Sequence, residues 1–421
     1  MIKAILLSVK LKKRAVRGFS PETSLEELWR LAETASLEPV KTLTVTLSAY
    51  NPGTLIGEGK IEELKGLIKE TSAKLVIFDT ALTSAQQRNL ERLLGVPAIE
   101  RTFLILEIFS QRARTMEGRL QVKLARFSYA ASRLTGKGAG LEQQHGMIGT
   151  RGPGERKIEY ERRTLRDKII ELKAGIETIR KERQNQRKTR DALPMAQISL
   201  VGYTNSGKST LLDRLTGGRH AIYTDDKLFA TLDPATKRVK LPDGGWALFT
   251  DTVGFIQNLP HQLIAAFRST LEGITCSDLI IHVHDGASSY PKLQHETVAR
   301  TMGDMGLEGI PVINVFNKSD LVKNPALSVW APASLKPVFV SALTGSGVKE
   351  LLGLAEMSLS RKWKEYSLEL PEQRSDLLRE LYKACTVKKT LYEDGRIKVT
   401  FKATPENYAR IVKRIEQALD A

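Results

Sequence analysis

The sequence predicts an α/β protein in which two α/β domains are separated by a basic helical hairpin and followed by a small α+β domain. Strand-like runs rich in β-branched residues alternate with segments of helical periodicity over residues 1–110, a pattern typical of parallel sheets. Within 194–360 a strand-like run leads through a glycine-containing loop into a helical segment, and further strand-like runs follow. Positive charge is concentrated between these two regions. The length of 421 residues, with 41% hydrophobic and 27% charged residues, is sufficient for two to four domains with buried cores.

Residues 1–110 form the first predicted domain. Three β-branched runs, "IKAILLSV", "KTLTVTL" and "KLVIFDT", alternate with three segments of helical spacing, "SLEELWRLAETA", "KIEELKGLIKET" and "TSAQQRNLERLLG". We therefore expect a small parallel sheet flanked by helices. The segment "GTLIGEGKI" (53–61) looks like a phosphate-binding loop, but Thr54 stands where the first glycine belongs and Ile61 replaces the magnesium-binding Ser or Thr. It is predicted to be a turn into a helix.

Residues 111–193 are predicted to be a helical hairpin that contacts RNA. Within 111–190, 21 Lys or Arg stand against 9 Asp or Glu, so this segment holds +12 of the chain's net charge of +16. A local excess of this kind favours a polyanionic partner. Apolar residues spaced three and four apart mark one face of each helix. They are Leu120, Leu124, Phe127, Ala131 and Leu134, then Leu165, Ile169, Leu172, Ile176 and Ile179.

A glycine-rich segment, "GKGAGLEQQHGMIGTRGPGE" (136–155), joins the two predicted helices and contains Lys137, His145 and Arg151. The second helix is expected from Arg156 to about Arg190, and its last part is nearly all polar. Two interpretations remain open from these residues alone. The hairpin is a solvated coiled coil, or its glycine-rich tip reaches into RNA.

The third predicted domain, residues 194–360, contains a phosphate-binding loop. In "ISLVGYTNSGKSTLL" a strand runs into G-x-x-x-x-G-K-S and then into a helix, which is the context that the motif requires. Loop N–H groups would bind phosphates at the positive end of the helix, the lysine would reach the β- and γ-phosphates, and the serine would ligate Mg²⁺. The expected nucleotide contacts are Gly202, Tyr203, Thr204, Asn205, Ser206, Gly207, Lys208, Ser209 and Thr210.

Further motifs follow at predicted strand ends. Thr231 in "FATLDP" is expected to cover the γ-phosphate and magnesium, with Thr224 and Thr236 as nearby alternatives. Asp251, after the strand "WALFT", is expected to hold magnesium through a water, and the Gly254 amide to contact the γ-phosphate. The predicted catalytic residues are Lys208, Thr231 and Gly254, and the predicted magnesium ligands are Ser209, Thr231 and Asp251.

The base is predicted to be guanine. The strand "PVINVF" ends in N-K-x-D, whose carboxylate, Asp320, can accept from the N1–H and 2-amino groups of guanine, a donor pair that adenine lacks. The backbone of the following "SAL" is expected to contact the guanine O6. This end of the site is expected to use Asn317, Lys318, Asp320, Ser341, Ala342 and Leu343. These motifs together, in this order, predict a P-loop GTPase domain.

The remaining features are less specific. Residues 361–421 follow a strand, helix, strand, strand, helix order, which predicts a small α+β domain. His282 and His284 in "LIIHVHDG" are predicted to be a packed core pair, because no third metal ligand is nearby in the sequence. Cys276 and Cys385 are far apart, which suits a reducing cytosol rather than a disulfide or zinc site. No run approaches 18 apolar residues and no signal peptide is expected.

The chain resembles the HflX family of ribosome-associated P-loop GTPases over nearly its whole length. The resemblance is carried by "GEGK" (57–60), "SAQQRNLER" (84–92), "EIFSQRART" (107–115), "RGPGE" (151–155), "VGYTNSGKSTL" (201–211), "LFATLDP" (228–234) and "DTVGFI" (251–256). In one place the chain departs from the family, which usually continues the glycine loop as "GPGETQLETDRR". Here it is "GPGERKIEYERR", in which Arg162 and Arg163 are kept.

The resemblance implies a cytoplasmic, ribosome-dependent GTPase that binds GTP or GDP with Mg²⁺ and acts on the large ribosomal subunit and its rRNA. Some family members split stalled ribosomes under stress, and the hairpin is implied to enter near the peptidyl-transferase centre. Asn205 looks like the asparagine of potassium-stimulated GTPases, so K⁺ is a candidate second ion. We expect a monomer without stable membrane insertion.

Phe255 follows the D-x-x-G turn, where the best-known small GTPases carry a water-orienting glutamine. We therefore expect slow hydrolysis by the isolated chain and stimulation by a partner, a contribution worth ~10³–10⁵-fold in other GTPases. The alternatives are a GTP-dependent ribosome assembly or hibernation factor, a non-ribosomal RNA-binding GTPase, a plain NTP hydrolase and a non-catalytic RNA-binding scaffold. The intact Lys208, Ser209 and Asp251 argue against the last.

Overall fold

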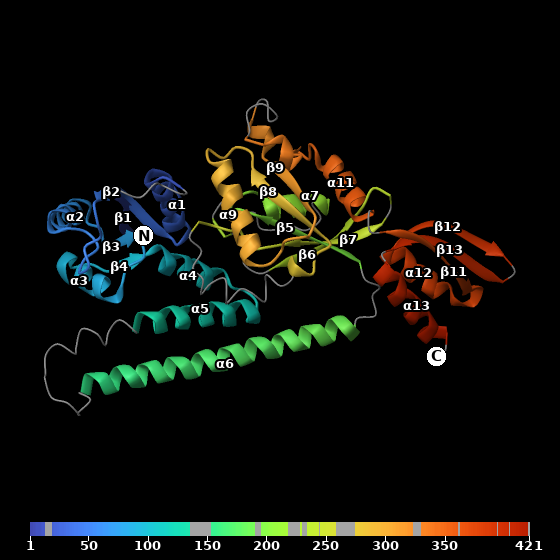
Figure 1. Ribbon diagram of the computed structural model, residues 1–421, viewed down its shortest axis with the longest axis horizontal. Helices are drawn as coiled ribbons and strands as arrows, with labels where there is room; N and C mark the ends of the chain where they lie inside the picture. Colours follow the sequence, from blue (N-terminus) through green and yellow to red (C-terminus); the bar gives the residue numbers. More distant parts are fainter. Residues whose placement is uncertain are drawn as a thin grey trace. The chain divides into compact units, whose positions relative to one another are not determined.

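The computed structural model contains two compact units, one built mainly from residues 1–181 and the other mainly from residue 182 onward (Figure 1). It describes residues 1–12, 19–134, 153–189, 195–217, 228–229, 234–243, 245–257, 274–322, 330–360, 363–393, 395–403 and 405–419. The predicted fold class is confirmed, since each α/β and α+β region takes the expected form. Thr231, Thr224 and the glycine-rich segment from Gly136 to Gly152 lie outside the described residues.

The N-terminal region is a four-stranded parallel sheet in the order β2-β1-β3-β4. Its core contains Ile5, Leu7, Val76 and Phe78. The segment "GTLIGEGKI" turns into α2, which begins at Glu58, and Ile61 of that helix is buried in the same core. The expectation that this segment is a turn into a helix is therefore confirmed. The strands are β1 (Ile2–Leu11), β2 (Leu37–Leu47), β3 (Leu75–Phe78) and β4 (Ala98–Glu100), and the helices are α1 (Pro21–Thr34), α2 (Glu58–Thr71) and α3 (Ser84–Leu94).

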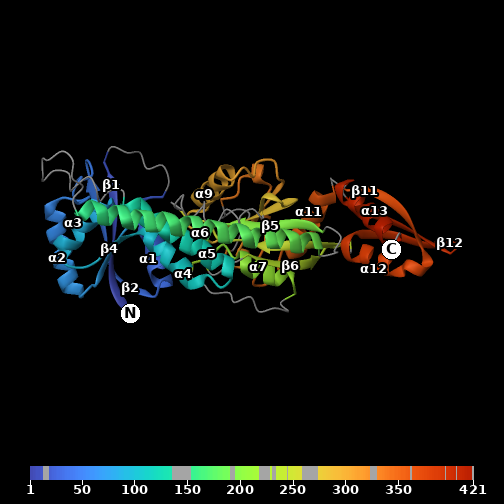
Figure 2. The same cartoon turned by 90° about the horizontal axis from the view of Figure 1, so that it is seen from below.

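Three further helices follow, α4 (Arg101–Arg112), α5 (Met116–Leu134) and α6 (Pro153–Thr189). Helix α6 begins three residues before the predicted Arg156, because proline is tolerated in the first turn of a helix. Figures 1 and 2 both show α5 and α6 side by side. A Cβ added at Gly175 would lie 3.7 Å from Leu120 Cδ1, and Lys168 Nζ lies 5.4 Å from the centre of the Phe127 ring. The predicted apolar seam therefore joins the two helices.

The GTPase region is a six-stranded sheet in the order β10-β9-β8-β5-β7-β6, in which only β6 runs antiparallel to its neighbour. The core packs α7 and α11 against one face, and α9 contacts β8 and β5. The strands are β5 (Ala196–Gly202), β6 (Ala235–Lys240), β7 (Trp246–Asp251), β8 (Leu279–Asp285), β9 (Val312–Asn317) and β10 (Val338–Phe339). The helices are α7 (Lys208–Leu215), α9 (Pro291–Asp304) and α11 (Val348–Ser360), with single turns η1 (Ser319–Leu321) and η2 (Ala333–Leu335).

The C-terminal region has the predicted strand, helix, strand, strand, helix order. Its antiparallel sheet runs β11-β13-β12, and its core includes Phe401 and the buried thiol Cys385. The elements are β11 (Lys364–Pro371), η3 (Glu372–Arg374), α12 (Ser375–Ala384), β12 (Thr386–Glu393), β13 (Arg396–Ala403) and α13 (Pro405–Leu419). Among the described helices, none combines the length and the apolar character needed to cross a membrane.

Candidate nucleotide site

The phosphate-binding loop joins the carboxyl end of β5 to the first residue of α7, Lys208. Two glycines are required there by close packing. A Cβ at Gly202 would lie 2.2 Å from the Val283 carbonyl oxygen, and a Cβ at Gly207 would lie 2.2 Å from Asn317 Nδ2. Gly207 also has φ +85°, and Asn205 adopts φ +60°, so the loop backbone uses conformations that most residues avoid.

The Lys208 ammonium is buried and is held by its own loop. Its Nζ donates to the carbonyl oxygens of Gly202 and Tyr203 at 3.1 and 2.9 Å. Burial lowers the pKa of Lys208 to about 8, while the charge of Asp251 acts in the opposite direction. The ammonium is therefore poised to exchange weak carbonyl acceptors for phosphate oxygens, which would raise its pKa again.

The predicted magnesium ligands that the structure describes lie together. Ser209 Oγ donates to Asp251 Oδ2 at 2.6 Å, at the carboxyl end of β7. The Asp251 side chain is fully buried. A hydroxyl and a carboxylate are oxygen donors of the type that Mg²⁺ prefers, and they fit that ion. Thr231, the third predicted ligand, lies outside the described part of the chain.

Two buried hydroxyls of the loop, Ser206 Oγ and Thr204 Oγ1, have no hydrogen-bond partner among the described residues. Both side chains are almost completely buried. Buried polar groups in proteins are normally hydrogen-bonded, so each exception needs an explanation. A bound phosphate or ion at the loop is the explanation that the surrounding residues support.

Phe255 is a structural residue of the loop and does not offer a polar group to a water molecule. Its N–H donates to the Gly202 carbonyl at 3.0 Å, and its carbonyl accepts from the Thr204 N–H at 2.8 Å. The Phe255 ring is buried. A Cβ at Gly254 would lie 2.8 Å from Thr204 Cα. The D-x-x-G turn is therefore packed directly against the phosphate loop.

Asn317 ties the phosphate loop to the predicted guanine pocket. Its Nδ2 donates to the Ser206 carbonyl, and its Oδ1 accepts from the Ala342 N–H, both at 2.9 Å. Lys318 Nζ lies 2.8 Å from Asp285 Oδ2 at the end of β8. The Asp320 side chain is exposed. Its carboxylate is therefore accessible to a guanine base that enters the site from solvent.

The S-A-L turn is supported by a residue that motif reasoning missed. Arg214, in the last turn of α7, donates from Nε to the Ala342 carbonyl at 2.8 Å and from Nη2 to the Leu343 carbonyl. The Leu343 side chain is 70% exposed, so only its backbone is held. Ser341 Oγ accepts from the Thr344 N–H at 3.0 Å. Arg214 belongs to no nucleotide motif, and its role is evident only from its hydrogen bonds to the Ala342 and Leu343 carbonyls.

The structure places most of the predicted site residues around the carboxyl ends of β5, β7 and β9, where a parallel α/β sheet binds its ligands. Thr210, which was also predicted to contact the nucleotide, lies in the first turn of α7. The residues brought together are Gly202, Tyr203, Thr204, Asn205, Ser206, Gly207, Lys208, Ser209, Asp251, Gly254, Asn317, Lys318, Asp320, Ser341 and Ala342.

His282 and His284 are buried and their rings are in contact, as predicted for a core pair, but one part of the expectation is wrong. His282 and His284 were expected to form a pair without a third ligand, but His295 of α9 lies beside them. The ring centres of His282 and His295 are 5.3 Å apart, as are those of His284 and His295. The strand and the helix are joined by a loop, so the sequence spacing of 11 and 13 residues did not reveal this contact.

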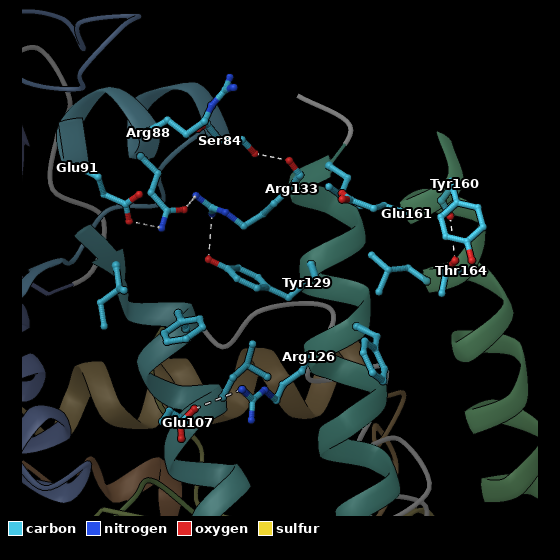
Figure 3. A pocket seen from close by; sticks show the side chains of 18 residues that line it. Ser84, Arg88, Glu91, Glu107, Arg126, Tyr129, Arg133, Tyr160, Glu161 and Thr164 are labelled. Atoms are coloured by element: carbon cyan, nitrogen blue, oxygen red, sulfur yellow. Dashed lines mark hydrogen bonds and ion pairs between the residues drawn. The ribbon is translucent and has the colours of Figure 1, made fainter. Parts of the chain in front are cut away.

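The first unit contains a separate cavity of about 810 Å³, lined by α3, α4, α5 and α6 (Figure 3). Its polar groups largely satisfy one another. Arg133 Nη2 donates to Gln87 Oε1 at 2.7 Å, and Arg126 lies 3.7 Å from Glu107. Apolar side chains such as Phe103 form much of the wall. Sequence reasoning missed this cavity, because periodicity gives the apolar face of each helix but does not show that four helices leave a space between them.

Four family models match the chain. Their descriptions are "GTP-binding GTPase N-terminal" (residues 22–110), "GTP-binding GTPase Middle Region" (112–190), "50S ribosome-binding GTPase" (197–318) and "HflX C-terminal domain" (326–420). Together these matches cover the first region, the hairpin, the nucleotide site and the C-terminal region.

Curated relatives match over most of their length. GTPase HflX of Escherichia coli K12 is 38% identical over 399 residues, which are 94% of this chain and 93% of the relative. GTPase HflX of Caldanaerobacter subterraneus is 42% identical over 354 residues, covering 84% and 81% of the two chains. A crystal structure of a GTP-binding protein from Sulfolobus solfataricus in complex with GDP is 23% identical, covers 86% of this chain and 99% of its own, and has a TM-score of 0.42.

Proposed function

Since this chain belongs to the HflX family of GTPases, we propose that its GTP hydrolysis is slow in isolation and is completed by the large ribosomal subunit. The observation that carries the proposal is the position of Phe255. Its ring is buried and its backbone is hydrogen-bonded to the phosphate loop. It therefore leaves the attacking water without the glutamine that orients it in other GTPases.

The site residues have distinct proposed roles. The loop N–H groups and Lys208 would bind the phosphates, and the Gly254 amide would contact the γ-phosphate. Ser209 and Asp251 would hold Mg²⁺, with Thr231 as the third candidate. When bound, Mg²⁺ would neutralise charge on the β- and γ-phosphate oxygens. The exposed Asp320 carboxylate would select guanine through its N1–H and 2-amino groups. A K⁺ ion near Asn205 remains part of the proposal.

Two observations support the ribosome as the partner. The match to the model described as "50S ribosome-binding GTPase" covers residues 197–318. Separately, α6 presents exposed cations, among them Arg163, Arg166 and Lys168. Arrays of this kind bind the phosphates of nucleic acids and release counterions. We propose that the hairpin contacts rRNA and that the protein acts as a cytoplasmic monomer in splitting or rescuing stalled ribosomes under stress.

The test is GTP turnover measured alone, with purified large subunits and with purified small subunits. We expect large subunits to stimulate turnover strongly and small subunits to leave it near the basal rate. A basal rate that already equals the stimulated rate would contradict partner-completed catalysis. Incubation with intact ribosomes, followed by sedimentation, separates the outcomes. Release of free subunits supports splitting, whereas binding without release supports an assembly or hibernation role.

A further inference from the structure

Three histidine side chains meet on the face of the GTPase sheet that α9 covers. His282 and His284 are two residues apart on β8, so both side chains leave the strand on the same side. His295 approaches from α9. Each ring offers one nitrogen as a possible ligand, and these three nitrogens lie within 4.8 Å of one another. The cluster lies next to the phosphate loop, since His282 is paired with Val201 on β5.

The cluster is buried but is not internally satisfied. His282 and His284 are only 1% and 4% exposed. Nδ1 of His282 and Nδ1 of His295 have no hydrogen-bond partner within the described part of the chain. A packed core pair would be expected to bury carbon or to pair its polar atoms. Two unpartnered imidazole nitrogens, in a cluster whose ligand atoms lie within 4.8 Å of one another, instead indicate a ligand that accepts lone pairs.

We propose that His282, His284 and His295 bind one first-row transition-metal ion of the zinc class. Three imidazole nitrogens with one open position form a recurrent zinc ligand set. His284 would bind through Nδ1, because its Nε2 lies 3.1 Å from Asn314 Oδ1. Asn314 would then accept the Nε2–H and fix the ring, which is the role of the outer partner in most histidine metal sites.

Burial disfavours the charged form of all three rings. Burial lowers the pKa of His282 far below its ordinary value and lowers that of His284 to about 4. It also lowers the pKa of His295. The positive charge of Lys208 contributes to the shift at His282, so the phosphate loop and the cluster are in electrostatic contact.

Binding requires a modest rearrangement of the rings. A tetrahedral site with metal–nitrogen distances of about 2.0–2.1 Å places its ligand nitrogens roughly 3.4 Å apart. The rings of His282 and His284 are now tilted by 36° to one another, with centres 3.9 Å apart. Rotation about the Cβ–Cγ bonds can turn their Nδ1 atoms toward one point. His295 is only partly buried, so it is the most solvent-accessible of the three ligands.

The test uses the full-length untagged chain, stripped with chelator and then saturated with GDP and excess Mg²⁺ so that the nucleotide site is filled. Calorimetric titration with Zn²⁺ should give one strong site per chain. Co²⁺ should give the visible absorption of a tetrahedral ion. Zn²⁺ should also raise the melting temperature, because binding to the folded state stabilises it. Absence of a strong Zn²⁺ site in the wild-type chain would overturn the proposal.

Variants assign the site. His295→Asn removes the partly exposed ligand, and His284→Phe keeps the ring that stacks on Phe316 while it removes a ligand. Each should weaken Zn²⁺ binding at least tenfold while GDP binding persists. His145→Asn, which changes a histidine that is not one of the three proposed ligands, should bind Zn²⁺ as the wild type does. Undiminished binding in both cluster variants would place the ion elsewhere and refute the assignment.

Discussion

At the residue scale, the nucleotide site is held by side chains that also bind one another. Asn317 connects the Ser206 carbonyl to the Ala342 N–H. Lys318 pairs with Asp285. Ser209 donates to Asp251. Because each link joins two different sheet-edge loops, the residues proposed to recognise the base and those proposed to bind the phosphates are positioned together. A substitution at a residue outside these links can therefore test nucleotide recognition without breaking the contacts that hold the site together.

The first prediction concerns Asp320. Asp320→Asn should weaken GTP binding by about 10- to 100-fold, because the guanine donors lose a charged acceptor. Affinity for xanthosine triphosphate should rise, since the new amide N–H matches the xanthine 2-oxo group. Fluorescence titration with labelled nucleotides measures both. Asp304→Asn, an exposed change on α9, is the matched control. Unchanged GTP affinity in Asp320→Asn would remove Asp320 from the base pocket.

The second prediction concerns the pH dependence of Lys208. Its folded pKa of about 8 lies below the ordinary value of 10.5. The unfolded chain therefore binds more protons between these two values, and stability should rise with pH across that window. The cost of burying the ammonium is fully present below about pH 8. Lys208→Met removes this cost, so its melting temperature relative to wild type should fall as the pH rises.

Melting curves of the nucleotide-free proteins between about pH 7 and pH 10 provide the measurement. The comparison of two chains cancels the titration of the other lysines and tyrosines. A melting-temperature difference that stays constant over this range would show that Lys208 keeps an ordinary pKa when folded.

At the element scale, β8 has a different character on each face. Ile281 and Val283 belong to the core that packs against α7 and α11. His282 and His284 lie on the opposite face with α9. The helix α6 shows the same division, because its seam residues Leu165, Ile169, Leu172, Ile176 and Ile179 are all partly buried. The cations Arg163, Arg166 and Lys168 occupy other positions of α6 and are exposed to solvent.

The third prediction concerns those cations. Changing Arg163, Arg166 and Lys168 to Gln should weaken binding to large ribosomal subunits and make it less dependent on salt. Each phosphate contact that is lost should reduce the slope of log affinity against log salt by about 0.7–0.9. The control changes Lys69, Lys74 and Arg88, which are also exposed. Equal effects from both sets would mean that net charge, and not α6, determines binding.

At the scale of the whole molecule, the chain contains a nucleotide site in one unit and the described part of the hairpin largely in the other. If a partner completes GTP hydrolysis, as proposed, then binding of that partner by the hairpin should change the rate of hydrolysis at the nucleotide site. The buried Phe255 and the basic hairpin are therefore expected to be coupled in activity even though they are far apart in sequence. The boundaries of the four domains proposed from sequence remain predictions.

The fourth prediction tests that coupling. Deleting residues 136–154 should leave GTP binding and basal turnover near the wild-type values, because the segment lies outside the GTPase region of the sequence. Stimulation by large subunits should fall sharply. Turnover assays with a titration of large subunits measure this, and GDP titration checks the nucleotide site. Full stimulation of the deletion variant would place the activating contact on the GTPase region itself.

The sequence alone determined the order of the elements and most of the nucleotide site. Its motifs each follow a strand, and the carboxyl ends of parallel strands meet at one edge of a sheet. Lys208, Asp251 and Asn317 therefore came together as predicted. The a/d spacing likewise predicted that α5 and α6 would pack, because helical periodicity fixes which residues share a face.

Only the tertiary structure decided which residues from unrelated segments meet. Arg214 holds the Ala342 carbonyl, and His295 joins His282 and His284. The cavity beside Arg133 is also formed only when four helices assemble. Local periodicity states which face of an element is apolar, but it does not state which neighbour will cover that face. That choice depends on how the elements pack, and it placed a third histidine where the sequence had predicted only two.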